Sequence, residues 1–192
     1  WPLLSREERL SLFRAAVEAS RRGFKVVAGV SALSTGEAVE LARAAGDLGV
    51  DAVLATPPLY CRAEGARLRE HFTRIADAAG KPLLVYTIPD NVGYNVPVED
   101  VAALATQPSL VAGIKATVPD LHYVHSLVAE VKTLRPDFAV LAGYGEYMLD
   151  TLLAGGDGAV DALANLVPGL LASIHRSWAE GRLGDAIKLH RA

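Results

Sequence analysis

A lysine near the end of a short apolar segment is the first residue in this sequence that could do chemistry. The segment runs from Val111 to Thr117 as Val-Ala-Gly-Ile-Lys-Ala-Thr, and Lys115 stands near its C-terminal end. Burial favours the neutral form of a lysine amine, and a neutral amine can attack the carbonyl carbon of a 2-oxo acid to form a Schiff base. The alternative is an ion-paired lysine, or one whose ammonium group reaches solvent. The rest of the chain decides between these interpretations.

The composition narrows the classes of protein to which the chain can belong. It has 192 residues, of which 51% are hydrophobic and 21% are charged, values that are typical of a globular domain. A net charge of -3 gives no electrostatic reason to bind nucleic acid or an anionic membrane. No apolar run approaches the roughly 20 residues of a membrane span. The single cysteine, Cys61, excludes an internal disulfide bond and a cysteine-based zinc site. We therefore expect one cytoplasmic domain.

Apolar segments alternate with amphipathic segments along the whole chain. The apolar segments, which we predict to be strands, are residues 25–30, 52–57, 82–89, 111–117, 139–143 and 158–165. The amphipathic segments between them are typical of helices, and two of these begin with capping-box spacing at Ser5 and Ser34. The clearest helical stripe runs from Leu121 to Leu134. Strands that alternate with helices and lack polar alternation predict a parallel sheet covered by helices.

Two architectures contain such a sheet, and the sequence favours the (β/α)8 barrel over the open doubly wound sheet. A doubly wound sheet usually carries a glycine-rich phosphate loop after an early strand, but Gly29-Val-Ser-Ala-Leu33 lacks the G-x-G-x-x-G spacing. A barrel has eight strands, whereas six are predicted here, and the sequence begins and ends within predicted helices. We therefore expect one TIM-barrel domain, 1–192, that is an internal portion of a longer protein.

Several segments together resemble the family of dihydrodipicolinate synthase and N-acetylneuraminate lyase, which are Schiff-base aldolases. These segments are Val27–Val30 with Ser34 and Thr35, Thr56–Tyr60, His71 and Phe72, Tyr86–Pro89 with Gly93, Gly113–Lys115, Gly143, and Gly155–Asn165 with Pro168. The resemblance implies a (β/α)8 barrel that assembles as a homo-oligomer, a dimer of dimers. It also implies that this chain supplies strands three to eight. The first two strands, and the Gly-Thr-Thr type loop that holds the substrate carboxylate, are then expected before residue 1.

The resemblance assigns catalytic roles to three residues. Lys115 matches the lysine on the sixth strand that forms the Schiff base. Tyr86 matches a tyrosine on the fifth strand that transfers protons during imine formation and carbon–carbon cleavage. Tyr60 matches a tyrosine that relatives contribute across a subunit interface. From the residues alone, Tyr86 also fits a core aromatic with a satisfied hydroxyl group, and Tyr60 also fits a loop aromatic packed on a neighbour.

Two departures from the family pattern bear on the substrate. The synthases carry an arginine where this chain has Asn91, which offers neither a charge nor a bidentate fork to a carboxylate. Thr117, two residues after the lysine, resembles the sugar-acid aldolases more than the synthases. In the last predicted strand, Val160 matches a substrate-binding position, and the adjacent Asp161 is unusual for the family and has no explanation from the sequence.

A third group of substrate-binding candidates follows the strand 139–143. Gly143, Tyr144 and Glu146 resemble the neuraminate lyase segment whose acidic side chains bind sugar hydroxyl groups, although Gly145 replaces one of the acids. Glu146 also fits an ordinary acidic residue in the first turn of a helix, where it interacts favourably with the helix dipole. Elsewhere, His122 and His125 have an i, i+3 spacing that can bind a metal, but no carboxylate is spaced to complete a site, so we expect a surface helix face.

The resulting prediction is a class I aldolase or lyase that acts on a 2-oxo acid, with pyruvate as product or donor. We expect no metal and no cofactor, because the protonated imine is itself the electron sink. A 2-keto-3-deoxy sugar acid is favoured over the condensation of pyruvate with aspartate semialdehyde by a dihydrodipicolinate synthase. A non-catalytic regulatory barrel of the same family is a second alternative. A phosphate-binding barrel with Lys115 as a charge clamp is disfavoured, because Ala164–Pro168 is not the glycine-rich turn that such a site prefers.

Overall fold

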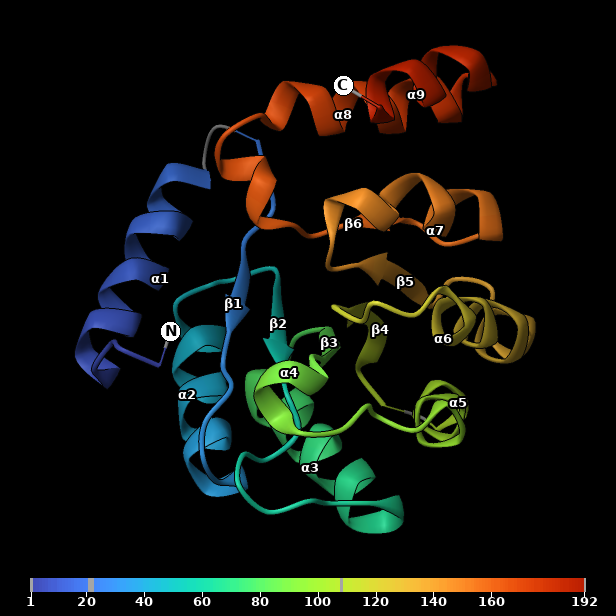
Figure 1. Ribbon diagram of the computed structural model, residues 1–192. Coiled ribbons are helices and arrows are strands. Elements are labelled where there is room, and N and C mark those ends of the chain that lie inside the picture. Colours follow the sequence, from blue (N-terminus) through green and yellow to red (C-terminus); the bar gives the residue numbers. More distant parts are fainter. Residues whose placement is uncertain (1, 21–22, 108, 192) are drawn as a thin grey trace.

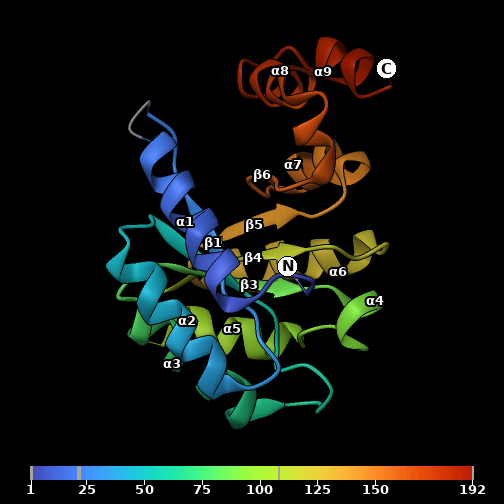
Figure 2. The same cartoon turned by 90° about the vertical axis from the view of Figure 1, so that its left-hand side faces the viewer.

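A computed structural model of the chain describes residues 2–20, 23–107 and 109–191, in which six strands form a parallel sheet. The strands are β1 Val27–Gly29, β2 Ala52–Ala55, β3 Leu83–Thr87, β4 Val111–Ala116, β5 Ala139–Ala142 and β6 Gly158–Ala159. Each strand pairs with the next one in the chain, so the sheet order is β1-β2-β3-β4-β5-β6. The sheet curls, with β1 and β6 as its two edges (Figure 1, Figure 2). A doubly wound sheet reverses its strand order, so the observed order is that of a barrel.

Helices connect the strands and cover one face of the sheet. The α-helices are α1 Arg6–Ser20, α2 Thr35–Asp47, α3 Gly65–Ala79, α4 Pro89–Val92, α5 Val98–Thr106, α6 Leu121–Ser126, α7 Met148–Ala154, α8 Pro168–Ala179 and α9 Leu183–His190. Both predicted capping boxes are confirmed at their N-cap residues: the Ser5 and Ser34 hydroxyl groups accept hydrogen bonds from the backbone N–H groups of Glu8 and Glu37, both at 3.2 Å. No helix in the described parts of the chain is both long enough and apolar enough to cross a membrane.

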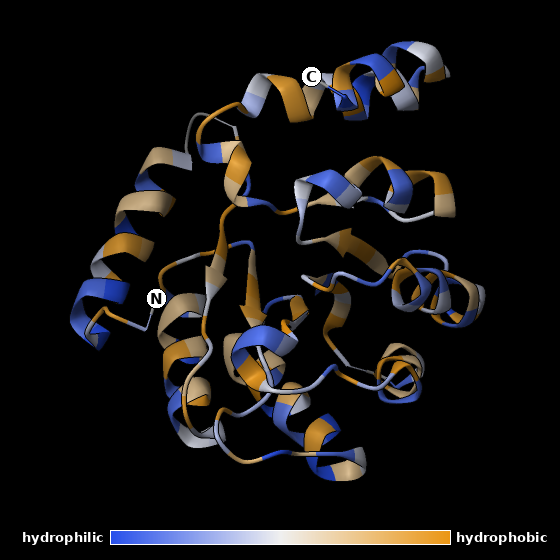
Figure 3. Ribbon diagram, in the orientation of Figure 1, coloured by the Kyte–Doolittle hydropathy of each residue, from blue (hydrophilic) through white to orange (hydrophobic). Residues whose placement is uncertain are grey.

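The two faces of the sheet differ in burial because side chains alternate along each strand. On the outer face, Val53, Val85 and Val140 are completely buried and belong to the main hydrophobic core that the helices complete. On the inner, concave face, Leu84 and Leu141 are only half-buried. Figure 3 shows the hydrophobic colouring of the strands and the mixed colouring of the helices around them. The inner face is therefore the side on which polar residues can meet a ligand.

Gly113 allows the three central strands to approach closely on this inner face. A Cβ atom at Gly113 would lie 2.7 Å from the Cβ of Ala139 and 2.8 Å from the Cδ2 of Leu84. The pairing of β3 with β4 is irregular at the same place, between Leu83 and Leu84. A glycine beside such an irregularity is typical of the bends by which a sheet curves into a barrel. This bend lies two residues before Lys115.

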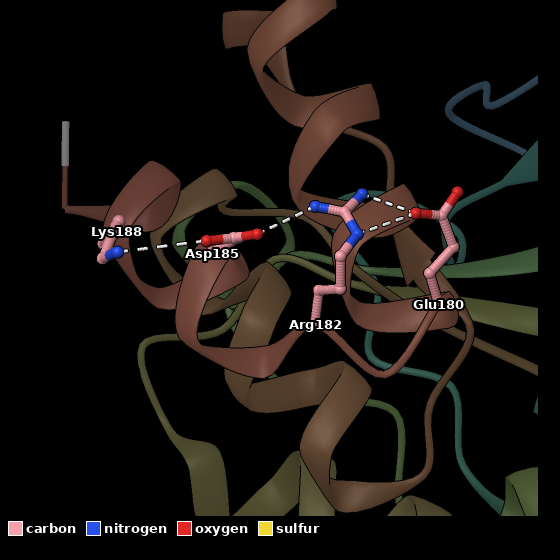
Figure 4. A network of polar contacts seen from close by, with 4 residues as sticks. All are labelled: Glu180, Arg182, Asp185 and Lys188. Atoms are coloured by element: carbon pink, nitrogen blue, oxygen red, sulfur yellow. Dashed lines mark hydrogen bonds and ion pairs between the residues drawn. The ribbon is translucent and has the colours of Figure 1, made fainter.

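The C-terminal helices form a small core of their own over α7. Leu149 of α7, Ile174 of α8 and Ala186 of α9 are its buried members. The turn between α8 and α9 is held by Arg182, whose guanidinium contacts Glu180 at 2.5 Å and Asp185 at 3.0 Å (Figure 4). These ion pairs are exposed, so each contributes little stability on its own. The network closes a short connection and has no contact with the inner face of the sheet among the interactions of the described residues.

The structure differs from the sequence predictions in three places. The predicted strand 158–165 ends at Ala159, because the Asp161 side chain accepts a hydrogen bond from the Ala162 N–H at 2.7 Å and caps a 3-10 helix, Ala162–Asn165. The predicted helical stripe 121–134 is confirmed at Val124, Leu127 and Val131, which are buried, but Leu134 is 58% exposed and the segment Leu127–Lys132 is a π-helix. Helix α4 was not predicted.

Candidate active site

The carboxyl ends of β3 and β4 bring Tyr86 and Lys115 side by side. The two residues are partners in the parallel ladder, so their side chains leave the sheet on the same face. The Nζ atom of Lys115 lies 4.3 Å from the centroid of the Tyr86 ring. Both side chains are half-buried on the inner face, and neither is sealed within the core. An amine and a phenol at this separation can act as nucleophile and proton donor on one carbonyl group.

Thr117 connects this pair to the next strand. Its hydroxyl group donates a hydrogen bond to the Tyr86 hydroxyl oxygen at 3.2 Å, and its side chain is buried. Gly143, directly after β5, makes room for this arrangement, because a Cβ atom at position 143 would collide with the Thr117 hydroxyl oxygen. The Gly143 N–H donates to the Ala116 carbonyl at 2.7 Å, which holds the two segments together. Lys115, Tyr86, Thr117 and Gly143 therefore form one contiguous unit across three strands.

A second contact joins the two segments that flank the carboxyl end of β4. The Tyr144 hydroxyl group donates a hydrogen bond to Asp90 Oδ2 at 3.4 Å. Asp90 lies in α4, which follows β3, whereas Tyr144 follows β5, so the pair joins the segments on either side of the strand that carries Lys115. Desolvation, and then the nearby Asp90 carboxylate, raise the pKa of Tyr144. The Tyr144 phenol therefore remains a hydrogen-bond donor at neutral pH.

A cleft of about 310 Å³ opens beside Tyr86. It is lined by Pro2, Thr56, Leu59, Tyr86, Ile88, Asn91 and Val92. The side chain of Asn91 is exposed, and the hydroxyl oxygen of Thr56 is buried with no hydrogen-bond partner among the described residues. The walls are mainly apolar, with the polar groups of three residues among them, which is the usual composition of a small-molecule site.

His71 fixes the end of β2 and the start of the loop that forms one wall of this cleft. Its Nε2 atom lies 3.0 Å from the Thr56 carbonyl oxygen, and its Nδ1 atom lies 2.9 Å from the Thr35 hydroxyl oxygen. A carbonyl can only accept a hydrogen bond, so Nε2 carries the proton and Nδ1 accepts from Thr35. The side chain is 2% exposed, and desolvation by this burial lowers the pKa of His71.

The lowered pKa of His71 predicts that the protein loses stability in mild acid. The folded state binds the His71 proton less tightly than the unfolded state, whose histidine pKa is about 6.5. The contribution of neutral His71 to the free energy of unfolding is therefore fully present above about pH 6.5. It is lost as the pH falls below this value, by at most about 1.4 kcal/mol per pH unit. Urea unfolding at pH 7.5, 6.5 and 5.5 measures the free energy of unfolding of the wild-type protein and of His71→Gln. This free energy should fall less steeply with decreasing pH in the variant.

A histidine that is exposed provides the control for this measurement. His125 lies on the solvent-facing side of α6, so His125→Gln should keep the wild-type slope. Equal slopes for the wild-type protein and His71→Gln would show that His71 does not hold its neutral form in the folded state. His122, which shares the exposed face of α6 as predicted, gives the same comparison at a second position.

The other predicted site residues lie at the same carboxyl edge of the sheet with exposed side chains. Tyr60, in the loop between β2 and α3, is 100% exposed and has a left-handed backbone φ of 72°. Glu146 is exposed in a 3-10 helix, Gly145–Tyr147. Val160 directly follows β6, is 42% exposed, and donates its N–H to the Ala142 carbonyl at 2.8 Å. In the described ranges, no three or more His, Cys, Asp or Glu side chains form a group that could hold a metal ion.

Sequence reasoning missed the roles of Asp90 and His71. A signal for α4 was present, because Pro89 at the first helical position and Gly93 directly after the last are the residues that typically begin and end a helix. That short helix places Asp90 opposite Tyr144. No local signal indicated the structural role of His71, since its partners Thr35 and Thr56 are distant in the sequence.

Comparison with known proteins identifies the family of this chain. A family model described as the dihydrodipicolinate synthetase family matches residues 1–192. The chain belongs to this family. It is 40% identical over 185 residues to an uncharacterised DapA-like lyase of Thermofilum pendens, and 36% identical over 184 residues to a protein of Escherichia coli K12 named probable 2-dehydro-3-deoxy-D-pentonate aldolase YjhH. Each match covers 96% of this chain, but only 62% and 61% of the two relatives.

Solved structures of the dihydrodipicolinate synthetase family share the fold. The crystal structure of YagE, a prophage protein of E. coli K12 in complex with pyruvate, superimposes on this chain with a TM-score of 0.94 and 31% sequence identity. The match covers 98% of this chain and 63% of YagE. The recognition of the family from the sequence is therefore confirmed. YagE is named a putative 2-dehydro-3-deoxy-D-gluconate aldolase, and this name and that of the pentonate aldolase are consistent with the sugar-acid side of the family.

Proposed function

We propose that this chain carries the catalytic lysine and tyrosine of a Schiff-base lyase that cleaves a 2-oxo acid and releases pyruvate. The observation that carries the proposal is the 4.3 Å separation between Lys115 Nζ and the Tyr86 ring at the carboxyl ends of adjacent parallel strands. Barrel enzymes place their catalytic groups at this edge. The printed names of the relatives support the same chemistry: the E. coli relative is named as an aldolase, and YagE was solved with pyruvate.

In the proposed reaction, the Lys115 amine attacks C2 of the 2-oxo acid, and loss of water leaves an iminium ion. The C3–C4 bond then breaks, and its electron pair moves into the iminium to give an enamine. The C4 hydroxyl group loses its proton and becomes the carbonyl group of the released aldehyde. Protonation of the enamine at C3 and hydrolysis release pyruvate and regenerate the amine. Tyr86 moves the protons in these steps, and Thr117 orients the Tyr86 hydroxyl group through their 3.2 Å hydrogen bond.

We further propose that β1 to β6 are strands three to eight of a complete barrel, and that the protein is a homo-oligomer of the cytoplasm. The sequential order of the strands and the half-exposed inner face support the first statement. The backbone of Tyr60 supports the assembly of a homo-oligomer. Its left-handed conformation costs a non-glycine residue roughly 1–2 kcal/mol, and its side chain is fully exposed. Strain at an exposed aromatic residue fits a contact with a partner subunit.

The substrate that fits this site best is a 2-keto-3-deoxy sugar acid. Asn91 lines the cleft beside Tyr86 and offers a neutral amide where a carboxylate substrate would need a positive charge. Tyr144 and Glu146 add neutral and acidic groups that suit hydroxyl groups better than a second carboxylate. A synthase that condenses pyruvate with aspartate semialdehyde would have to desolvate that carboxylate without an arginine.

The protein at its full encoded length should therefore cleave a 2-keto-3-deoxy sugar acid more efficiently than it condenses pyruvate with aspartate semialdehyde. Asn91→Arg should shift the ratio of the two kcat/KM values toward the semialdehyde by about 10- to 100-fold, since a charge-assisted hydrogen bond is worth about 1.5–3 kcal/mol. Gln107→Arg, at the exposed C-cap of α5 before β4, is the matched control. A wild-type enzyme that already favours the semialdehyde tenfold would establish the synthase function instead.

A further inference from the structure

The carboxylate of Asp161 has one oxygen for which the structure provides no donor. Its Oδ1 atom accepts the hydrogen bond from the Ala162 N–H at 2.7 Å that caps the 3-10 helix after β6. Its Oδ2 atom is buried and has no hydrogen-bond partner in the described part of the chain. A buried oxygen without a donor is costly, and native structures rarely retain one without a functional reason.

The absence of a side chain at Gly145 makes this position of the carboxylate feasible. A Cβ atom at position 145 would collide with Asp161 Oδ2, so the oxygen occupies the space that any other residue would need. Gly145 does not have a left-handed φ, so its backbone conformation does not require glycine. The requirement is the space alone. Asp161 and Gly145 therefore form a matched pair, although 16 positions separate them in the sequence.

The pair continues the polar residues of the candidate active site toward the edge of the sheet. Tyr86, Lys115 and Thr117 lie in or directly after β3 and β4, Gly143 abuts Thr117 after β5, and Asp161 follows β6. All these positions are at the carboxyl edge of a parallel sheet. A substrate whose C2 is bound to Lys115 can extend its tail along this edge, away from the reacting carbon.

One apolar side chain, that of Leu163, lies near Gly145 and Asp161. The Cδ1 atom of Leu163 would lie 3.1 Å from a Cβ atom at Gly145, close to the same point as Asp161 Oδ2. Leu163 is 44% exposed and belongs to neither hydrophobic core. Leu163 can therefore move at little cost in buried apolar surface.

We propose that Asp161 Oδ2 accepts a hydrogen bond from a hydroxyl group on the tail of the sugar-acid substrate, and that Asp161 thereby determines specificity for polyhydroxylated substrates. The inference rests on the proposed function and names a recognition group for it. A hydroxyl group is a neutral donor that satisfies a carboxylate oxygen, whereas a tail that ends in a carboxylate would be repelled by it. Gly145 is retained because it leaves room for the acceptor.

The test compares two substrates of the protein at its full encoded length. 2-Dehydro-3-deoxypentonate carries a terminal hydroxyl group, and 4-hydroxy-2-oxopentanoate keeps the C4 hydroxyl needed for cleavage but lacks the terminal one. Asp161→Asn keeps an oxygen for the helix cap and removes the charge, and Gly145→Ala places a methyl group against Oδ2. Both variants should lower kcat/KM for the pentonate by about 10- to 100-fold, as expected for a lost hydrogen bond to a charged group, with the loss mainly in KM. Both variants should keep kcat/KM for 4-hydroxy-2-oxopentanoate within about twofold of the wild-type value.

Controls separate this inference from a structural role and from the proposed function. Asp47→Asn, at an exposed position at the end of α2, should change kcat/KM for neither substrate. Equal losses for both substrates, or no loss for either, would overturn the role of Asp161. Borohydride trapping of pyruvate on the wild-type protein is measured in parallel. If trapping occurs and the two substrates respond equally to Asp161→Asn, only the role of Asp161 fails; if trapping does not occur at all, the proposed function fails with it.

Discussion

Replacement of Lys115 by arginine should abolish the covalent trapping of pyruvate by borohydride and lower kcat by roughly 10⁴-fold or more, since removal of a nucleophile has effects of this size. The guanidinium of arginine stays protonated and does not form the imine. In the wild-type protein, reduction in the presence of pyruvate should add mass to the peptide that contains Gly113-Ile-Lys115. Peptide mass spectrometry after reduction measures this directly.

A second lysine on the opposite edge of the sheet is the matched control. Lys81 lies just before β3, at the amino end of the strand that carries Tyr86 at its carboxyl end, so Lys81→Arg should keep both trapping and activity. A mass addition on any lysine other than Lys115, or trapping that survives in Lys115→Arg, would contradict the assignment. Binding of pyruvate without turnover in the wild-type protein would support the non-catalytic barrel instead.

Replacement of Tyr86 by phenylalanine should lower kcat by roughly 10²- to 10⁴-fold, which is the usual contribution of a positioned acid or base. The aromatic ring beside the Lys115 amine remains in this variant, so the effect isolates the hydroxyl group. Thr117→Val removes only the donor to that hydroxyl, and should lower kcat by up to about tenfold, the value of one neutral hydrogen bond. Single-turnover measurements of imine formation and of pyruvate release would locate the slowed step.

Tyr123→Phe distinguishes loss of a proton-transfer group from loss of a structural hydrogen bond. The Tyr123 hydroxyl group donates to the Val96 carbonyl at 2.6 Å in the buried part of the fold. Its removal should cost about 1 kcal/mol of stability and leave kcat unchanged, whereas Tyr86→Phe should do the reverse. If Tyr86→Phe keeps more than a tenth of the wild-type kcat, Tyr86 is a core aromatic as the sequence alone also allowed.

The sequence alone predicted the parts of this fold whose causes are local. Ser5 and Ser34 identified two helix starts correctly, because a capping box is complete within four residues. The end of α3 has an equally local cause, because Gly80 after its last turn adopts the left-handed conformation that favours glycine. The apolar segments predicted parallel strands, since the strands of a helix-covered parallel sheet are apolar on both faces and contain little polar alternation.

Predictions failed where the deciding contact came from elsewhere in the fold. The segment after Ala159 has apolar residues that suit a strand, but Asp161 caps a 3-10 helix there and the described sheet offers no further strand beyond β6 for pairing. Likewise, a regular helical stripe did not reveal the π-helix at Leu127, because the spacing of apolar residues predicts which face is buried and not how each turn closes.

The sequence determined which residues are available for the chemistry: a lysine and a tyrosine near the ends of apolar strands, an asparagine in place of an arginine, and an unexplained aspartate. Only the tertiary structure decided which of them meet. The ladder register, set after an irregularity at Leu83 and Leu84, brings Tyr86 opposite Lys115, and strand curvature brings Gly143 against Thr117 and Gly145 against Asp161. These contacts join residues 16 to 29 positions apart. No periodicity within a single segment encodes such pairs, because they depend on how far each strand slides and bends against its neighbour.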